Sequence, residues 1–199
     1  MSIETMESME NIVGVLLAGG RARRMGGGDK CLRSLAGRPL LERIVERVRP
    51  QVSTLILNAG GDGERFAAYG LPVVADTIPD FAGPLAGVLA GLEWAADKGA
   101  PWLVSFATDA PFLPDDLVAR LAGAVEDAGA DMACAASGGR AHPVFGLWPV
   151  ALKGELRRAL ADEDMRKIDR RPGPHDLAPA DSPSRPLRPF FTAHSPASP

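Results

Sequence analysis

The chain has 199 residues, which is enough for one compact domain with a buried core. Its formal net charge is −3 and 46% of its residues are hydrophobic, so its charge does not favour binding to nucleic acid or to an anionic membrane. No apolar run approaches the ~20 residues that span a bilayer, and the start M-S-I-E-T-M-E-S-M-E is acidic where a secretory signal is basic and then apolar. We therefore expect a cytoplasmic protein with neither nucleic acid nor membrane as a partner.

The two cysteines, Cys31 and Cys134, lie far apart in the chain. No histidine stands near them at metal-ligand spacing, and a cytoplasmic protein keeps its thiols reduced. We expect both to be structural or incidental thiols.

The predicted elements alternate along the chain. Residues 12–17 form a short apolar run with branched side chains, as in a strand that is buried on both faces. Residues 39–49 place Leu40, Ile44 and Val48 on one helical stripe, with Pro39 at the first position. Strands are predicted next at 53–57, 72–75, 102–107, 131–136 and 142–148, and helices at 64–69, 85–97, 114–128 and 150–162. Such alternation predicts an α/β fold with a single doubly wound, mostly parallel sheet.

The two ends of the chain differ in composition from its middle. Residues 1–11 are predicted to be a flexible N-terminus and residues 12–166 to be the folded domain. Residues 167–199 are crowded with proline, and we expect a loop-rich, partly disordered segment there, with one candidate edge strand at 187–192.

Small or polar residues follow the predicted strands. Ala18 and the two glycines after it, then Asn58, Asp76 and Asp109, each come directly after an apolar run. In an open α/β sheet, ligands bind at the carboxyl ends of the strands, where helix N-termini and backbone amides point. These residues are therefore predicted to form one binding site.

The segment L-A-G-G-R-A-R-R-M-G-G-G-D-K at 17–30 suits a polyphosphate. Gly19 and Gly20 let backbone amides approach phosphate oxygens, and Arg24 and Lys30 add full positive charges. The spacing matches neither G-x-x-x-x-G-K-[ST] nor G-x-G-x-x-G, which disfavours a Walker-type ATPase and a Rossmann dehydrogenase. A different kind of nucleotide loop is predicted.

Two further segments fit a nucleotide. Asp109 follows a buried strand and precedes a proline turn, where its carboxylate can bind Mg²⁺ while ligand phosphates complete the coordination shell. Gly83, Pro84 and Leu85 open a long helix with little bulk, which leaves room for a base or ribose against the backbone.

Each candidate also has a structural interpretation. Asp76 can turn the chain or cap a helix, Asn58 can form a turn, and Asp109 can cap the turn into the next helix. His142, at the start of a predicted strand, can be an ordinary structural histidine. The agreement among the strand ends favours the functional interpretation of the first three.

The pattern L-A-G-G-x-x-x-R-M-G-x-x-D-K resembles the signature of nucleotidyltransferases with the glycosyltransferase-A-like fold, in the form typical of molybdenum cofactor guanylyltransferases. The blocks that follow are also similar: L-N-A at 57–59, V-V-A-D at 73–76, G-P-L-A-G at 83–87, T-D-A-P at 108–111 and H-P-V-F at 142–145. The resemblance is close over residues 12–150. It implies the Rossmann-like fold of the nucleotide-diphospho-sugar transferases.

By position, the resemblance assigns roles to single residues. Leu17, Ala18 and Gly19 would contact the guanine nucleotide, and Lys30 would bind its phosphates. Asn58 and Asp76 would hold the base and ribose, and Asp109 would bind Mg²⁺. The implied reaction transfers GMP from GTP to the terminal phosphate of molybdopterin carrying molybdenum and releases pyrophosphate. Transient contact with proteins that insert molybdenum or use the cofactor is also implied.

The acceptor end of the chain departs from the family pattern. Relatives close with a block resembling F-x-N-I-N-T-P-E-D-L, whose asparagines face the pterin, whereas this chain has Thr192 and His194 there. Thr192 and His194 can still form hydrogen bonds, although they can equally belong to a frayed tail. Arg166 and Lys167 are candidate ligands of the acceptor phosphate, or an exposed basic loop, and His142 is a further acceptor candidate.

Two other functions stay open on the sequence. A cytidylyltransferase or another nucleotidyltransferase with a different acceptor is one, although cytidylyltransferases tend to carry L-A-A-G where this chain has L-A-G-G. A GTP-binding regulator that has lost transfer is the other, because the C-terminal block is altered.

Overall fold

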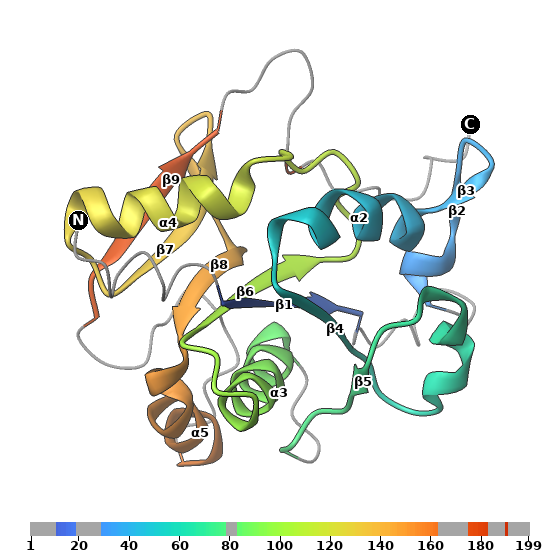
Figure 1. The fold of residues 1–199 in the computed structure, drawn as a ribbon, viewed down its shortest axis with the longest axis horizontal. Helices are drawn as coiled ribbons and strands as arrows, with labels where there is room; N and C mark the ends of the chain where they lie inside the picture. Colours follow the sequence, from blue (N-terminus) through green and yellow to red (C-terminus); the bar gives the residue numbers. More distant parts are fainter. Residues whose placement is uncertain (1–10, 19–28, 79–82, 163–174, 183–189, 191–199) are drawn as a thin grey trace.

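The computed structural model describes residues 11–18, 29–78, 83–162, 175–182 and 190. Its centre is a seven-stranded sheet in the order β5-β4-β1-β6-β8-β7-β9 (Figure 1). The strands are β1 (Ile12–Leu17), β4 (Thr54–Asn58), β5 (Val73–Val74), β6 (Trp102–Ala107), β7 (Met132–Ser137), β8 (Arg140–Pro149) and β9 (Leu177–Asp181). A separate two-stranded ribbon pairs β2 (Ser34–Leu35) with β3 (Arg38–Pro39).

The sheet is mostly parallel. β1 pairs in parallel with β4 and β6, β4 pairs in parallel with β5, and β7 pairs in parallel with β9. β8 is antiparallel to both of its neighbours, β6 and β7. The predicted doubly wound, mostly parallel α/β sheet is confirmed, with β8 as the strand that runs against the rest.

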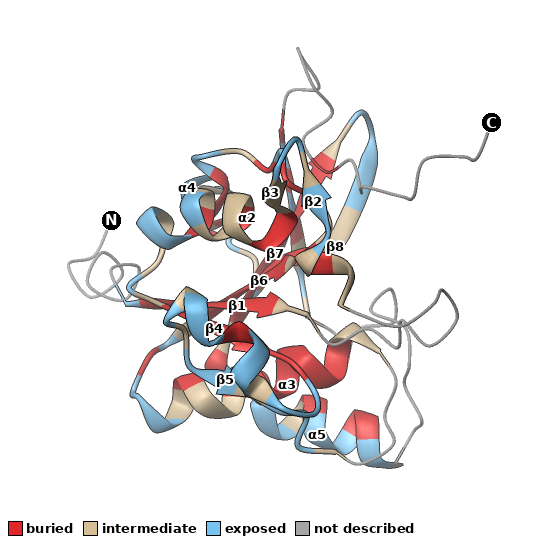
Figure 2. Cartoon of the chain, turned by 90° about the vertical axis from the view of Figure 1, so that its right-hand side faces the viewer, coloured by how far each residue is buried: buried red, intermediate tan, exposed pale blue. Residues whose placement is uncertain are grey.

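In the described part of the chain, four α-helices cover the two faces of the sheet. α2 (Leu40–Val48) and α4 (Leu117–Ala128) lie on one face, and α3 (Pro84–Asp97) and α5 (Lys153–Asp162) lie on the other (Figure 1). Successive residues of β1 point to opposite faces, so that Leu16 joins the core under α2 and α4 while Val15 joins the core over α3. The central strands are accordingly buried on both sides (Figure 2). None of the described helices is long and apolar enough to cross a membrane.

Several element boundaries differ from the sequence prediction. α4 begins at Leu117 rather than at Pro114, because the amide of Val118 donates to the side chain of Gln51 at 3.0 Å and the chain before it forms a turn. Residues 63–69 form a 3₁₀ rather than an α-helix, and a 3₁₀ turn at Val150–Leu152 precedes α5. These boundaries depend on contacts with distant segments, so a local sequence pattern does not predict them.

β9 is a strand that the sequence analysis did not predict. It reads L-A-P-A-D, with Ala178 and Ala180 buried and Pro179 between them. Proline is tolerated because β9 is the edge strand of the described sheet. Of the predicted strand at 187–192, Phe190 alone is described, and it lies in a turn.

Candidate functional site

The carboxyl ends of three neighbouring strands are tied together by hydrogen bonds. The amide of Ala18, after β1, donates to the carbonyl of Asn58 in β4 at 2.9 Å. The hydroxyl of Thr108, after β6, donates to the carbonyl of Leu17 at 3.0 Å. Residues that are far apart in the sequence thus meet at one edge. We call the described members of this group the strand-end site: Leu17, Ala18, Lys30, Asn58, Asp76, Gly87, Thr108 and Asp109.

Lys30 and Asp109 form an ion pair in the strand-end site. Lys30 Nζ lies 2.8 Å from Asp109 Oδ2, although 79 residues separate the two in the chain. Lys30 opens a 3₁₀ helix (Lys30–Leu32) after the glycine segment, and Asp109 follows β6. The side chains are 37% and 27% exposed, so both charges are accessible to a ligand.

The carboxylate next to Lys30 in sequence has its own partner. Asp29 pairs with Arg65, whose guanidinium lies over the ring of Phe66 at 4.4 Å. Arg65 also donates to the carbonyl of Gly60 at 2.8 Å. These contacts hold Asp29 toward the 3₁₀ helix at 63–69 and leave Asp109 as the carboxylate beside Lys30.

Asn58 and Asp76 form the second polar pair of the site. Asn58 is 3% exposed, and its Nδ2 donates to Asp76 Oδ1 at 3.0 Å and to the carbonyl of Val74 at 3.3 Å. A buried amide with satisfied donors has a fixed orientation. Asn58 is thus a positioned polar group and not a turn former, because it is the last residue of β4.

The start of α3 approaches Asn58 closely. A Cβ at Gly87 would lie 2.3 Å from Asn58 Oδ1 and 2.7 Å from Leu17 Cδ2, so only glycine allows this approach. Gly83 is the residue before α3, Pro84 is its first residue, and the Leu85 side chain is buried in the core. The positive end of the α3 dipole therefore lies close to the polar residues at the strand ends.

The donor set suits a divalent cation that brings its own ligands. No group of three or more His, Cys, Asp or Glu residues that could hold a metal occurs in the part of the chain that the structure describes. Asp109 offers one hard carboxylate, and the Lys30 ammonium already lies where a cation would meet it. Mg²⁺ is typically held by one or two carboxylates together with substrate phosphates, and this site fits that arrangement.

Cys31 and Cys134 are both buried and form no disulfide, which fits the expectation of structural thiols. Burial, with a smaller contribution from Asp29, raises the pKa of the Cys31 thiol to about 11. A protonated, inaccessible thiol beside the site is a poor nucleophile, which supports the structural interpretation of Cys31.

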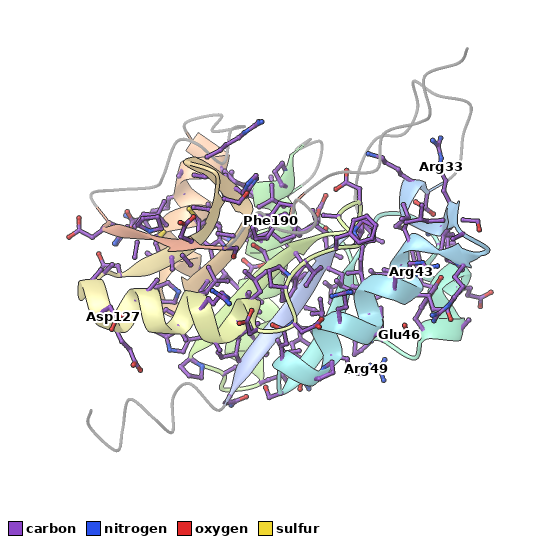
Figure 3. The ribbon with its side chains drawn as sticks, turned by 90° about the horizontal axis from the view of Figure 1, so that it is seen from above. Arg33, Arg43, Glu46, Arg49, Asp127 and Phe190 are labelled. Atoms are coloured by element: carbon purple, nitrogen blue, oxygen red, sulfur yellow. The ribbon has the colours of Figure 1, made fainter. Side chains whose placement is uncertain are left out.

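His142 lies in β8 and is not part of the strand-end site. Its Nε2 is 2.9 Å from the Ser137 hydroxyl, and its ring is 4.6 Å from the ring of Phe190, which also contacts Phe145 at 4.9 Å. Figure 3 shows Phe190 beside the strands of this region, far from Arg43 on α2 and from Arg49 just after it. Burial lowers the pKa of His142, so its imidazole is neutral at pH 7. These contacts favour a structural role for His142.

Several predicted site residues lie outside the described residues: Gly19, Gly20, Arg24, Arg166, Lys167, Thr192 and His194. Two described members of the strand-end site, Thr108 and Gly87, are noted in the sequence as neighbours of Asp109 and of Gly83 to Leu85, but no site role was predicted for either. Both stand inside the quoted blocks T-D-A-P and G-P-L-A-G, which were the available signal.

Comparison with known proteins identifies relatives over nearly the whole chain. A family model described as "MobA-like NTP transferase domain" matches residues 14–177. A molybdenum cofactor guanylyltransferase of Nitrobacter hamburgensis is 54% identical over 184 residues, which cover 92% of this chain and 88% of that protein. A molybdenum cofactor guanylyltransferase of Cupriavidus necator is 46% identical and covers 87% of each chain.

Solved structures share the fold at lower identity. Molybdopterin-guanine dinucleotide biosynthesis protein A from Archaeoglobus fulgidus aligns with a TM-score of 0.63 and 23% identity, over 85% of this chain and 83% of that one. A 4-diphosphocytidyl-2C-methyl-D-erythritol synthase from Anaerococcus prevotii aligns with a TM-score of 0.63 and 14% identity, over 90% of each chain. The α/β architecture is therefore that of nucleotidyltransferases.

Proposed function

Because the chain belongs to the family of MobA-like NTP transferases and is a nucleotidyltransferase, we propose that it transfers GMP from GTP to the terminal phosphate of molybdopterin carrying molybdenum. The products are molybdopterin guanine dinucleotide and pyrophosphate. Relatives named molybdenum cofactor guanylyltransferase at 46% to 54% identity support the choice of nucleotide and acceptor.

The observation that carries the proposal is the ion pair of Lys30 and Asp109. It sets a cation and a carboxylate in contact at 2.8 Å, at the carboxyl edge of the sheet where nucleotides bind. Both groups remain partly exposed, so a triphosphate with its metal can reach them. A purely structural ion pair would give no reason for the glycine segment that directly precedes Lys30.

The remaining site residues hold the nucleoside in this proposal. Leu17 and Ala18 offer backbone at the end of β1, and Gly83, Pro84 and Leu85 offer the start of α3. The linked pair of Asn58 and Asp76 would accept and donate hydrogen bonds to the base and ribose. Gly19, Gly20 and Arg24 would complete the phosphate loop from outside the described residues.

The chemistry requires positioning and charge neutralisation. A terminal phosphate oxygen of the acceptor attacks the α-phosphorus of GTP, the bond to the β-phosphate oxygen breaks, and pyrophosphate leaves. The attacking oxygen is already ionised, so no protein nucleophile is needed. Lys30 would bind phosphate oxygens, and Asp109 would hold Mg²⁺, which supplies further positive charge to the triphosphate when it is bound.

The proposed acceptor site is drawn from five candidate residues. His142, Arg166, Lys167, Thr192 and His194 are the candidates to contact the pterin or its phosphate, with His142 the weakest because it is already engaged by Ser137 and Phe190. Both described thiols are buried and form no disulfide, which favours work in the reducing cytoplasm. Transient contact with molybdenum-inserting proteins or molybdoenzymes would deliver the substrate and remove the product.

A direct assay tests the proposal. The chain is incubated with Mg²⁺, molybdopterin carrying molybdenum, and GTP, CTP or ATP, and pyrophosphate and the dinucleotide are measured. GTP should give both products and the other nucleotides little of either. Absence of product with GTP, in a reaction where a known guanylyltransferase succeeds, would contradict the proposal, and a preference for CTP would reassign the nucleotide.

A further inference from the structure

The Lys30 ammonium occupies the position beside Asp109 that a divalent cation would take. Lys30 Nζ lies 2.8 Å from Asp109 Oδ2, so the two groups are in direct contact. We propose that Lys30 keeps divalent cations off Asp109 until the phosphates of a nucleotide bind the lysine, so that metal and nucleotide are taken up together. This inference deepens the proposed function and rests on its assignment of Asp109 as the metal ligand.

Contact distance makes the two cations competitors. Mg²⁺ binds a carboxylate oxygen at about 2.0–2.1 Å, so a metal on Asp109 would lie within a few ångströms of the ammonium that now touches Oδ2. Like charges at that separation repel, and the repulsion is reduced but not removed at a site that is about one-third exposed. A lone metal must therefore displace Lys30 before it can bind.

The described surroundings offer a lone metal little compensation. Asp29 is paired with Arg65, and Asp76 accepts a hydrogen bond from Asn58. No cluster of three candidate metal ligands exists among the described residues. A metal at Asp109 would consequently depend on ligands from outside the protein, which a triphosphate supplies.

A triphosphate removes the obstacle and supplies the ligands in one step. Phosphate oxygens attract the Lys30 ammonium away from Asp109, and the same triphosphate carries the cation to the freed carboxylate. Binding of nucleotide and metal is then positively coupled, and by linkage each raises the affinity for the other by the same factor. Part of that coupling would come from the release of Lys30.

The test measures Mn²⁺ binding to the full chain by electron paramagnetic resonance, without nucleotide. Lys30→Met, which keeps the length of the side chain but removes its charge, should raise the Mn²⁺ affinity by about tenfold. Lys30→Arg retains the charge and should bind Mn²⁺ as weakly as the parent chain. Lys98→Met is the matched control, because Lys98 lies at the far end of α3 near Trp94 and should leave the affinity unchanged.

A second arm assigns the gain to Asp109. Adding Asp109→Asn to Lys30→Met should abolish the gain in Mn²⁺ affinity. Adding guanosine 5′-(α,β-methylene)triphosphate, which cannot transfer GMP, should raise Mn²⁺ affinity in the parent chain about tenfold more than in Lys30→Met, if release of Lys30 contributes to the coupling. Melting temperatures identify any variant that is unfolded.

The outcomes separate this inference from the proposed function. Equal Mn²⁺ affinity in the parent chain and in folded Lys30→Met would overturn the inference, even if the parent chain guanylylates molybdopterin. A gain in Lys30→Met that depends on Asp109 would support it, even if the parent chain transfers nothing to that acceptor. A gain that survives Asp109→Asn would place the metal elsewhere and would also overturn it.

Discussion

The two halves of the sheet present different carboxyl edges. In the nucleotide half, formed by β1, β4, β5, β6 and α3, the polar side chains bond to one another across strands, as Asn58 does with Asp76 and Lys30 with Asp109. In the acceptor half, formed by β7, β8, β9 and α4, aromatic rings pack together and His142 is enclosed by Phe190 and Ser137.

This difference bears on which residues would select the nucleotide and which would select the acceptor. In the proposed nucleotide half, the hydrogen bond between Asn58 and Asp76 holds both side chains, which reduces the cost of ordering them when a nucleotide binds. Apart from His142, the residues proposed to contact the acceptor lie outside the described part of the chain. We therefore expect substitutions in the nucleotide half to affect GTP use and those in the described acceptor half to affect stability.

The largest effect is expected for Asp109→Asn. Loss of the carboxylate charge should lower kcat/KM for GTP by about 10³-fold and remove most of the dependence on Mg²⁺, because the proposed metal ligand is lost. Pyrophosphate release measured against Mg²⁺ concentration checks this. Asp115→Asn is the control, since Asp115 is 78% exposed and pairs with Arg47 on α2. Retained Mg²⁺ dependence in Asp109→Asn would move the metal site out of the nucleotide half.

A second variant separates charge from packing. Lys30→Ala should lower kcat by about 10²-fold, because a cation near the phosphates stabilises developing charge. The melting temperature should change little, since the ion pair is partly exposed and such pairs contribute about 0–1 kcal/mol. Lys98→Ala serves as control in the same kinetic and melting experiments. An unchanged rate for Lys30→Ala would mean that the loop holds something other than the phosphates.

A third variant adds one methyl group at Gly87, where α3 approaches Asn58. Gly87→Ala should raise KM for GTP about tenfold, because the new Cβ would lie 2.3 Å from Asn58 Oδ1 and would displace this amide. Gly91→Ala, one turn further along α3, approaches only apolar side chains, the nearest at 3.0 Å. It should lower stability while KM for GTP stays unchanged. Equal KM values for the two variants would contradict the positioning of Asn58 by α3.

The smallest effect concerns His175, which joins the acceptor half to α5. Its Nε2 lies 2.9 Å from Glu155 Oε2 and its Nδ1 lies 3.5 Å from Asp131 Oδ2, and the bond to Glu155 raises the pKa of His175. A raised pKa in the folded state stabilises the fold below the unfolded-state pKa of about 6.5, and this stabilisation is lost as the pH rises through the folded-state pKa. The contribution is small, because solvent screens a partly exposed pair.

Denaturant unfolding of His175→Gln at two pH values tests whether the stabilisation by His175 is lost as the pH rises. The loss of stability relative to the parent chain should be larger at about pH 5.5 than at about pH 8.5. His142→Gln is the opposite case, because the pKa of His142 is lowered and its neutral form is favoured in the fold. Its cost should therefore be smaller at the lower pH. The same pH trend for both variants would contradict the opposite pKa shifts of His175 and His142.

The fold was predictable where local patterns coincide with tertiary structure. The apolar run at 12–17 is β1, because a strand that is buried on both faces of a parallel sheet is apolar throughout. The stripe of Leu40, Ile44 and Val48 is the buried face of α2, because a helix on a sheet buries one face. β9 was missed because L-A-P-A-D is short and contains proline, and its strand conformation depends on pairing with β7. Pairing of that kind has no local signal.

The sequence indicated which residues gather at the strand ends, but not the contacts that they form there. Strand ends and glycines indicated Lys30, Asn58, Asp76 and Asp109. That Lys30 bonds Asp109, while the neighbouring Asp29 bonds Arg65, depends on how distant loops pack. The close approach of α3 to Asn58, which makes Gly87 necessary, is likewise a property of the assembled layers.

The antiparallel strand β8 joins two stretches of chain to which the proposed function gives different tasks. Every described residue proposed to bind the nucleotide lies between Leu17 and Asp109, whereas β7, β8 and β9 follow in later sequence and join the earlier strands through the pairing of β8 with β6. A chain divided in this way can change the molecule that it modifies through substitutions in its later part. The earlier part can keep the same nucleotide chemistry while the later part changes.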